Sequence, residues 1–400
     1  MTDEPLAMIR RRTRRHPEGT GRRVLYGITV PQSAATLLRG QLGWFREQGW
    51  DVHLVTSPGP LLDTVRDRES VTVHPLPMQR EIELRTDARA LAQWIRLLRE
   101  LRPDVLNIGT PKAGLLGTIA GWLVRVPRRV YIMRGLRLEG ARSLPQRSVL
   151  WLAERLTVLL ATDVVCVSPS LRDEAASWRL FGRRRPVVLG IGSSNGVNPD
   201  RWDPDLAAAD RDAVRKEWHA AEDDLVVGFV GRISYTKGVP DLLEAFRMVE
   251  DLPVVLVLVG PVEDEALRPV LAALGERVVR LDEWATDLAD AYAGMDVLAL
   301  PTDREGFPNV VLEAALAEVP TITTRATGAR DSVVPGVTGW LVDVGSPPQL
   351  AEAIRACVRD RDAVRAAGRA ARERALTHFR PQSIWSGLES IYLGGGATSD

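Results

Sequence analysis

Two glutamates and two basic residues in the second half of the chain have types and spacings that suit one kind of ligand. Glu305 and Glu313 stand eight positions apart in REGFPNVVLEAALAEVP (residues 304–320). A carboxylate accepts two hydrogen bonds at once, which matches neighbouring hydroxyls of a ribose or another sugar. Arg232 and Lys237 share the stretch GRISYTKG, and a planar guanidinium beside a mobile ammonium suits a diphosphate. Together they predict a nucleotide-sugar site.

Other phosphate-binding motifs do not account for these cations. The glycine and lysine spacing in GRISYTKG differs from that of a Walker loop, and no G-x-G-x-x-G follows a predicted strand. The sequence therefore disfavours P-loop hydrolysis and dinucleotide-dependent oxidoreduction. A solvated loop with two exposed cations is the alternative, and the loop by itself does not decide between the two.

A helix start between the two glutamates strengthens the prediction of an anion site. The helix is expected to begin near Pro308 or Asn309, with Asn309 as its cap, directly after a strand at residues 296–302. Its first N–H groups would lack partners at the positive end of the helix dipole. An acidic cap followed by a solvated glutamate is the alternative, but it explains neither Gly306 and Pro308 nor the apolar flank.

The elements that must position these residues alternate along the chain. Runs of Val, Ile and Leu separated by helical patterns are typical of a parallel sheet covered on both faces. A stretch rich in Gly, Ser, Asn and Pro at residues 186–204 interrupts the alternation. We expect two doubly wound α/β domains facing each other across a cleft, with ligands beyond the carboxyl ends of the strands. The predicted strands are at residues 22–30, 51–57, 71–76, 104–110, 129–135, 163–170, 225–231, 253–260, 277–282, 296–302, 320–324 and 339–342. The predicted helices are at residues 34–48, 87–101, 113–124, 145–161, 240–250, 287–294, 309–317, 348–375 and 380–394.

With these motifs in place, the chain resembles the retaining GT-B glycosyltransferases of family 4. The eight-residue glutamate spacing, GRISYTKG, SNGV (residues 194–197) and VVPGVTGWLV (residues 333–342) stand where that family has counterparts. The first half resembles the capsular-polysaccharide branch through LLRGQLGWFREQGWDVHLVTSPG (residues 37–59), TPKAGLLG and RGLRLEG. The resemblance implies two Rossmann-like domains, with an acceptor domain at residues 21–195 and a donor domain at residues 196–378. It also implies a last helix at residues 379–395 that crosses back to the first domain.

The resemblance also assigns roles to individual residues. Arg232 and Lys237 would hold the donor diphosphate and stabilise it as it leaves, while Glu305 would bind hydroxyls of the transferred sugar. Glu313 would bind the ribose. Transfer would proceed with retention and without a cofactor or divalent metal, because cations and helix N–H groups do that work. The remaining expected donor-site residues are Gly231, Gly306, Phe307, Pro308, Asn309 and Val310.

The acceptor side is less specific, and three residues are candidates. Many relatives carry histidine where this chain has Arg134, and an arginine stays protonated and cannot act as a base. Arg134 could instead neutralise an anionic donor sugar or an acceptor diphosphate, or be an exposed cleft arginine. Lys112 follows a predicted strand and could bind an acceptor phosphate. Ser168 is expected to point into the cleft or to cap the next helix.

Composition and charge limit the protein class and suggest a partner. The chain has 400 residues, 45% hydrophobic content and two cysteines, and no stretch long and apolar enough to span a membrane. These features, with no secretory signal, favour a cytoplasmic globular protein. Residues 1–195 contain 31 basic and 18 acidic side chains. The basic tail at residues 1–20, which we expect to be disordered, contributes to this excess of positive charge. Such an excess suits an anionic membrane surface or a solvated face equally well. Nothing indicates a metal site or a nucleic-acid partner.

The main hypothesis is a retaining transferase that uses a UDP-sugar and extends a lipid-linked or cell-surface glycan at the inner membrane face. Three alternatives stay open. The acceptor could be a soluble small molecule such as a secondary metabolite, or the protein could be a nucleotide-sugar epimerase that needs no acceptor. It could also be a non-catalytic nucleotide-sugar-binding subunit.

Overall fold

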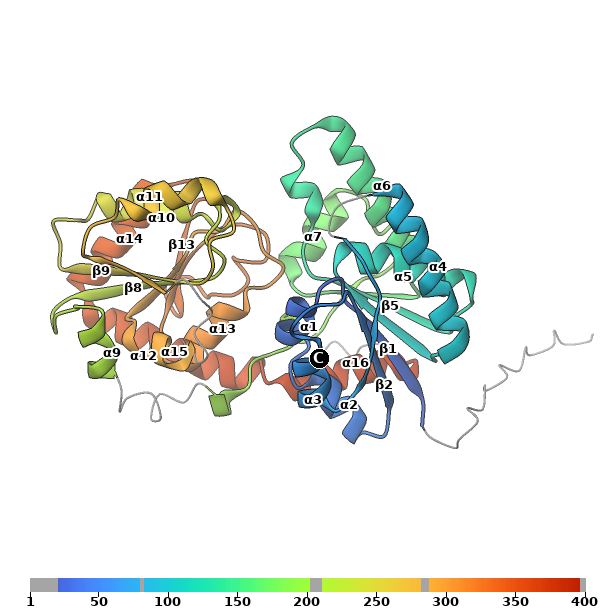
Figure 1. Ribbon diagram of the computed structural model, residues 1–400. Coiled ribbons are helices and arrows are strands. Elements are labelled where there is room, and N and C mark those ends of the chain that lie inside the picture. Colours follow the sequence, from blue (N-terminus) through green and yellow to red (C-terminus); the bar gives the residue numbers. More distant parts are fainter. Residues whose placement is uncertain (1–20, 80–82, 202–210, 282–287, 396–400) are drawn as a thin grey trace, which may run out of the picture.

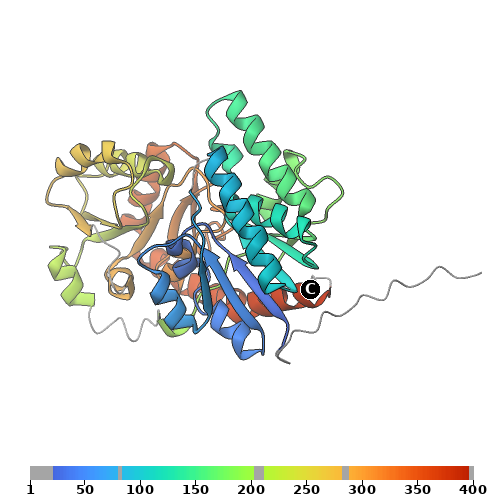
Figure 2. The same cartoon turned by 45° about the vertical axis from the view of Figure 1, so that its right-hand side comes forward.

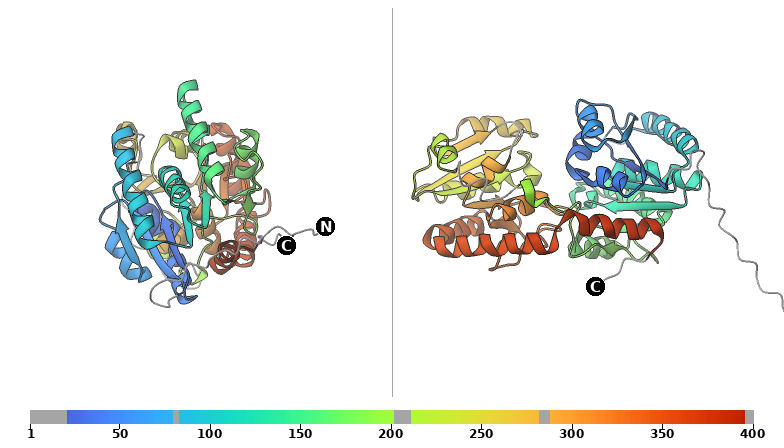
Figure 3. Two further views of the ribbon diagram at one scale, coloured as in Figure 1. Left: turned by 90° about the vertical axis from the view of Figure 1, so that its right-hand side faces the viewer. Right: turned by 90° about the horizontal axis from the view of Figure 1, so that it is seen from below.

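The computed structural model describes residues 21–79, 83–201, 211–281 and 288–395 (Figure 1). The basic tail predicted at residues 1–20 lies outside the described residues. Two parallel sheets, each flanked by helices, form two domains that lie side by side, as the views in Figures 1 and 3 show. The predicted class, a GT-B arrangement of two doubly wound α/β domains, is confirmed.

Within the described part of the chain, the first domain contains a seven-stranded sheet in the order β3-β2-β1-β4-β5-β6-β7. Strand β1 is central, and Val24 pairs with Val52 on one side and Val105 on the other. Apolar side chains cover both faces of these strands because helices pack on each side. The strands are β1 (Arg23–Gly27), β2 (Asp51–Thr56), β3 (Thr72–Pro75), β4 (Val105–Gly109), β5 (Arg128–Met133), β6 (Asp163–Cys166) and β7 (Val187–Val188). The helices are α1 (Pro31–Leu37), α2 (Gln41–Glu47), α3 (Leu62–Glu69), α4 (Leu84–Leu101), α5 (Pro111–Leu123), η1 (Arg137–Gly140), α6 (Leu144–Leu160) and α7 (Pro169–Ser177).

The second domain contains, over its described residues, a six-stranded parallel sheet in the order β10-β9-β8-β11-β12-β13. The strands are β8 (Leu225–Val230), β9 (Val254–Val259), β10 (Val278–Leu281), β11 (Val297–Leu300), β12 (Thr321–Thr324) and β13 (Gly339–Val342). The longer helices are α9 (Arg211–Glu217), α10 (Val239–Arg247), α11 (Arg268–Ala272), α12 (Leu288–Gly294), α13 (Asn309–Leu316), α14 (Pro347–Arg359), α15 (Arg361–His378) and α16 (Pro381–Leu393). Short 3-10 turns are η2 (Pro199–Arg201), η3 (Tyr235–Lys237) and η4 (Glu265–Leu267).

Several local details differ from the sequence-based expectations. The helix predicted at residues 34–48 is two helices, α1 and α2, because the chain turns at Gly40, which has a φ of +74°. The helix predicted at residues 348–375 is two helices, because Asp360 ends α14 and its carboxylate then accepts a hydrogen bond from Ala363 N at 2.9 Å, which caps α15. Asn309 is the first residue of α13 rather than its cap, a position that Pro308 occupies. The interrupting stretch at residues 186–204 also contributes a strand, β7.

Helix α16 packs on the first domain although it follows the second in the chain. Tyr392 lies among Phe45 and Trp50 of the first domain, with ring centroids 5.1 and 5.6 Å apart. Trp385 Nε1 donates to Asn195 Oδ1 at 2.7 Å, and the Trp385 ring lies 5.8 Å from that of Trp44. Figure 3 shows this red helix running beneath the first sheet. The last helix is therefore part of the first domain's core.

Candidate active site

A cavity of about 290 Å³ lies between the two domains. It is lined by residues that follow β4, β5, β8 and β11, so it sits at the carboxyl ends of both sheets, where doubly wound folds bind their ligands. Its charged lining comes from both halves of the chain. The first domain contributes Arg134, Arg137 and Glu139. The second contributes Arg232, Lys237, Arg304 and Glu305.

The loops after β8 and β11 meet because these two strands are neighbours in the sheet. The carbonyl oxygen of Thr236 accepts hydrogen bonds from Asp303 N and Thr302 Oγ1, both at 3.1 Å. Gly238 has a φ of +70°, and a Cβ there would lie 1.8 Å from the carbonyl oxygen of Pro301. Only glycine fits at this position, which fixes the turn that follows Lys237.

The contact between the two loops brings together a cation and a carboxylate from the predicted site. Lys237 Nζ donates to Glu305 Oε1, and both side chains are largely buried. Arg232 is more exposed and pairs with Glu263, an acidic residue that the sequence analysis did not single out. The predicted diphosphate-binding cations thus share one cavity and one domain.

The turn between Glu305 and α13 touches the first domain directly. A Cβ on Gly306 would lie 2.1 Å from the carbonyl oxygen of Arg134, so the glycine permits this close approach. The Phe307 ring is buried and lies 5.4 Å from the Phe379 ring, which leaves only its backbone for a ligand. The first turn of α13 offers its N–H groups next to this contact, with Asn309 and Val310 as its first residues.

Glu313 is held by a tyrosine of the neighbouring helix α12. The Tyr292 hydroxyl donates to Glu313 Oε2 at 3.0 Å, and burial raises the pKa of Tyr292 well above its usual value, so the hydroxyl stays a donor. Glu313 lies just over one turn into α13, as predicted, but it does not line the 290 Å³ cavity. Gly231, Phe307, Pro308, Asn309 and Val310 likewise lie outside its lining.

The three acceptor candidates have different surroundings. Arg134 lines the cavity, and its Nη1 donates to Ser194; burial lowers its pKa to about 10, so it remains a cation at neutral pH. Lys112 is buried and donates to both oxygens of Asp87 at 2.5 and 2.6 Å. Ser168 is fully buried and caps α7 through Leu171 N at 3.3 Å, which matches the capping alternative.

Glu139 is a cavity residue that the sequence reasoning missed. It lies on η1, and its carboxylate accepts a hydrogen bond from Thr327 of the second domain. Its Oε2 is buried and has no hydrogen-bond partner among the described residues. Burial raises the pKa of Glu139, partly offset by the Thr327 bond and by Arg304 and Arg330. The only sequence signal was the acidic position within RGLRLEG.

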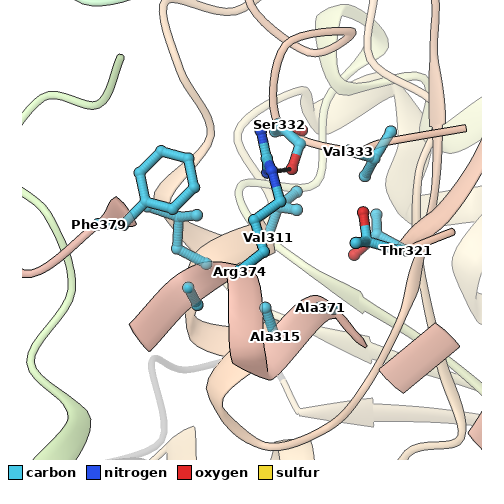
Figure 4. A pocket seen from close by; sticks show the side chains of 11 residues that line it. Val311, Ala315, Thr321, Ser332, Val333, Ala371, Arg374 and Phe379 are labelled. Carbon is cyan, nitrogen blue, oxygen red and sulfur yellow. Dashed lines mark hydrogen bonds between the residues drawn. The ribbon is translucent and has the colours of Figure 1, made fainter. Parts of the chain in front are cut away.

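A set of hydrogen bonds behind α13 connects the second domain to the first. Figure 4 shows Arg374 of α15 beside Val311 and Phe379, with its guanidinium directed at Ser332. Arg374 donates to the carbonyl oxygens of Ser332 at 2.7 Å and Asp331 at 3.0 Å. The Asp331 carboxylate in turn accepts from Ser170 N at 2.9 Å across the domain boundary. The segment at Asp331 and Ser332 is thereby tied both to α15 and to the first domain.

Comparisons with known families cover most of both domains. Residues 34–192 match the model described as "Glycosyl transferase 4-like domain", and residues 210–374 match "Glycosyl transferases group 1". The described residues contain no helix long and apolar enough to cross a membrane.

Individual proteins are similar along nearly the whole chain. The capsular polysaccharide biosynthesis glycosyltransferase CapM of Staphylococcus aureus is 35% identical over 92% of this chain and 96% of its own. An Escherichia coli UDP-Gal:alpha-D-GlcNAc-diphosphoundecaprenol alpha-1,3-galactosyltransferase is 24% identical over 74% of this chain and 76% of its own. The crystal structure of Anabaena HepE in complex with UDP-glucose superposes with a TM-score of 0.76, at 21% identity, over 92% of this chain and 98% of that one. The chain is therefore a GT-B glycosyltransferase and belongs to the group 1 family of glycosyl transferases.

Proposed function

We propose that this enzyme moves a sugar, with retention, from a UDP-sugar to a lipid-linked glycan acceptor during cell-surface polysaccharide synthesis at the inner membrane face. One observation carries the proposal. Arg232, Lys237 and Glu305 gather at the carboxyl ends of adjacent strands, facing Arg134 and Glu139 of the other domain. Cations for a diphosphate and carboxylates for sugar hydroxyls therefore line a single cavity.

The comparisons support the choice of donor and acceptor. The names of the S. aureus and E. coli relatives refer to capsular polysaccharide and to a diphosphoundecaprenol acceptor with a UDP-sugar donor. The HepE structure contains UDP-glucose. A lipid diphosphate acceptor also agrees with the surplus of basic residues in the first 195 positions.

In the proposed reaction the side chains position reactants and stabilise charge. The bond between the anomeric carbon and the diphosphate oxygen breaks as the acceptor oxygen attacks the same face. The acceptor proton passes to a donor phosphate oxygen. Lys237 and Arg232 stabilise the negative charge that develops on the departing diphosphate, helped by the N–H groups at the start of α13. Glu305 orients the sugar hydroxyls and Glu313 the ribose.

The acceptor side needs no protein base in this scheme. Arg134 keeps its proton at neutral pH, so it serves as a fixed positive charge for an acceptor diphosphate or an anionic sugar. Lys112 and Ser168 are weaker candidates for direct contact with the acceptor. Lys112 donates to Asp87, and Ser168 caps α7. Their contribution would be to fix the loops that border the acceptor.

A thermal-shift screen tests the donor assignment. UDP, GDP, ADP and their sugars are added to the wild type and to Glu313→Gln, because a ligand that binds only the folded state raises the melting temperature. We expect a shift with UDP and one UDP-sugar that is reduced in Glu313→Gln. A shift with GDP or ADP alone would overturn the UDP assignment, and no shift with any nucleotide would overturn the donor-site assignment itself.

Product analysis tests the reaction itself. The enzyme is incubated with the stabilising donor and either a diphosphoundecaprenol-linked sugar or a panel of soluble small molecules. Mass spectrometry of the extracted lipid should show the gain of one sugar, and NMR of the product should show that its new linkage keeps the anomeric configuration of the donor. Transfer only to a soluble compound would replace the lipid acceptor, and interconversion of free sugars without an acceptor would indicate an epimerase.

A further inference from the structure

The outward face of α6 carries large exposed apolar side chains along its length, with Ser148 and Arg155 between them. Leu144, Val149, Leu152 and Leu159 are 74, 51, 62 and 53% exposed. At 100° per residue these four side chains fall on one side of the helix, and the buried residues Leu150, Glu154, Thr157 and Val158 fall on the other. Figures 1 and 2 show α6 projecting from the upper part of the first domain. A solvated helix normally carries charged residues on such a face.

The exposed charged side chains within residues 141–160 are basic. Residues 141–160 contain three arginines, Arg142, Arg147 and Arg155, and one carboxylate, Glu154. Glu154 is buried on the inner face, where the Tyr131 hydroxyl donates to it at 2.9 Å, and burial raises its pKa to about 7. Nearby, Arg184 donates to the carbonyl oxygen of Leu159 at 3.0 Å. The exposed surface of α6 thus combines apolar side chains with cations and presents no carboxylate.

The position of α6 relates this face to the cavity. Helix η1, which carries Arg137 and Glu139 into the cavity, ends at Gly140, and α6 begins at Leu144. Arg304 of the second domain packs on Gly140, because a Cβ there would lie 2.4 Å from Arg304 Nη1. The apolar face therefore starts within a few residues of the acceptor side of the cavity.

We propose that α6 docks the enzyme on an anionic lipid bilayer, with its leucine face inserted at the headgroup level and its arginines on lipid phosphates. An exposed apolar face flanked by cations has the chemistry of an interfacial helix, and the positive charge selects an anionic leaflet. This inference deepens the proposed function, because a lipid-linked acceptor anchored in that bilayer would present its diphosphate close to η1.

Vesicle flotation tests the docking surface. The full-length protein is mixed with vesicles of phosphatidylcholine alone or with 40% phosphatidylglycerol (on the order of the anionic content that attracts basic surfaces). Three double variants are compared: Leu144→Asn/Leu152→Asn, Arg142→Gln/Arg147→Gln, and Val334→Asn/Val337→Asn. The last is a matched control, because Val334 and Val337 are exposed valines that belong to the second domain and not to α6.

We expect wild type and control to float with anionic vesicles and not with neutral ones, and high salt to reduce binding. Each α6 double variant should bind at least about 10-fold more weakly. Equal binding by the leucine variant and the wild type would overturn the proposal, as would failure of the wild type to bind anionic vesicles. Concentration-dependent self-association that the leucine variant abolishes would assign the face to a second copy instead.

Two further readouts separate this inference from the proposed function. The melting temperature of each variant shows whether it is folded, and the UDP-induced shift reports on the donor site. Lost vesicle binding with an intact UDP shift supports docking through α6. Normal vesicle binding without a nucleotide-induced rise in melting temperature would support the docking surface and would overturn the proposed transferase function.

Discussion

At the scale of single residues, Lys237 pairs with Glu305, which places opposite charges at the positions that we propose for the phosphate and the sugar of the donor. The ammonium and the carboxylate are largely buried and in contact, so each reduces the cost of burying the other. A bound donor would give each a partner of its own, a phosphate for Lys237 and hydroxyls for Glu305. Binding and charge stabilisation therefore depend on the same two side chains.

Replacement of Lys237 tests its proposed role in turnover. Lys237→Ala should lower kcat by about 10²-fold, because one charge-stabilising donor is lost from the transition state. Steady-state kinetics with the identified donor measure the effect. Lys216→Ala is the control, since Lys216 lies on α9 outside the cavity and should leave kcat unchanged. An unchanged kcat in Lys237→Ala would make the diphosphate assignment wrong.

Glu313 is expected to act on donor binding rather than on turnover. Glu313→Gln should raise the donor KM about 10-fold, in line with the loss of one charged hydrogen-bonding partner, with a smaller effect on kcat. Tyr292→Phe removes the 3.0 Å bond to the carboxylate of Glu313 and should give a weaker change in the same direction. A loss confined to kcat in both variants would contradict the ribose role.

Glu139 offers a test of the acceptor side. Glu139 lines the cavity, and its buried Oε2 has no hydrogen-bond partner among the described residues, so we predict that this carboxylate accepts a hydroxyl of the acceptor. Glu139→Gln should raise the acceptor KM and leave the UDP-induced thermal shift unchanged. A reduced UDP shift would instead move Glu139 to the donor site. Isothermal titration with UDP checks this separation directly.

At the scale of elements, the sheet strands were the most predictable part of the fold. Continuous valine runs such as those in β8 and β9 indicate strands buried on both faces, and both strands lie within their predicted ranges. The break at Asp360 was missed because the apolar spacing continues across it. The sequence also could not reveal partners set by tertiary structure, such as Asp87 for Lys112 or Thr327 for Glu139.

Helix α6 makes the stability of the first domain depend on pH through Glu154. Its folded pKa of about 7 lies above the ordinary 4.5, so the folded state binds the extra proton between these values. Stability is therefore fully present below about pH 4.5 and falls as the pH rises through 7, by about 3 kcal/mol in total. Tyr131 donates to this carboxylate and Arg137 lowers its pKa in part.

Urea unfolding at pH 5 and pH 8 checks this dependence. Glu154→Gln has a neutral side chain that can still accept a hydrogen bond from Tyr131. The free energy of unfolding of this variant should therefore differ much less between pH 5 and pH 8 than that of the wild type. Glu100→Gln, an exposed change on α4, should retain the wild-type difference. If Glu154→Gln and wild type lost stability equally between pH 5 and pH 8, another group would be responsible.

At the scale of the whole molecule, the Asp331 contact and helix α16 are two of the connections that join the domains. Asp331 of the second domain accepts from Ser170, and α16 packs into the first domain through Trp385 and Tyr392. Trp385→Ala should lower the free energy of unfolding of the first domain by about 3–5 kcal/mol. Trp122→Ala is the control, because that indole is half-exposed and its loss should change stability by less than about 1 kcal/mol. Calorimetry of the two variants measures the difference.

The return of α16 also fixes the order in which the protein can be completed during synthesis. The first domain leaves the ribosome early. Its residues Tyr26, Trp50 and Asn195 lack their hydrogen-bond partners on α16 until this last helix emerges. The core of the first domain therefore stays incomplete while the ribosome synthesises the whole second domain. For the same reason, cutting the gene between the domains does not yield two independent halves. A working split would need residues 381–393 to be grafted onto the first fragment.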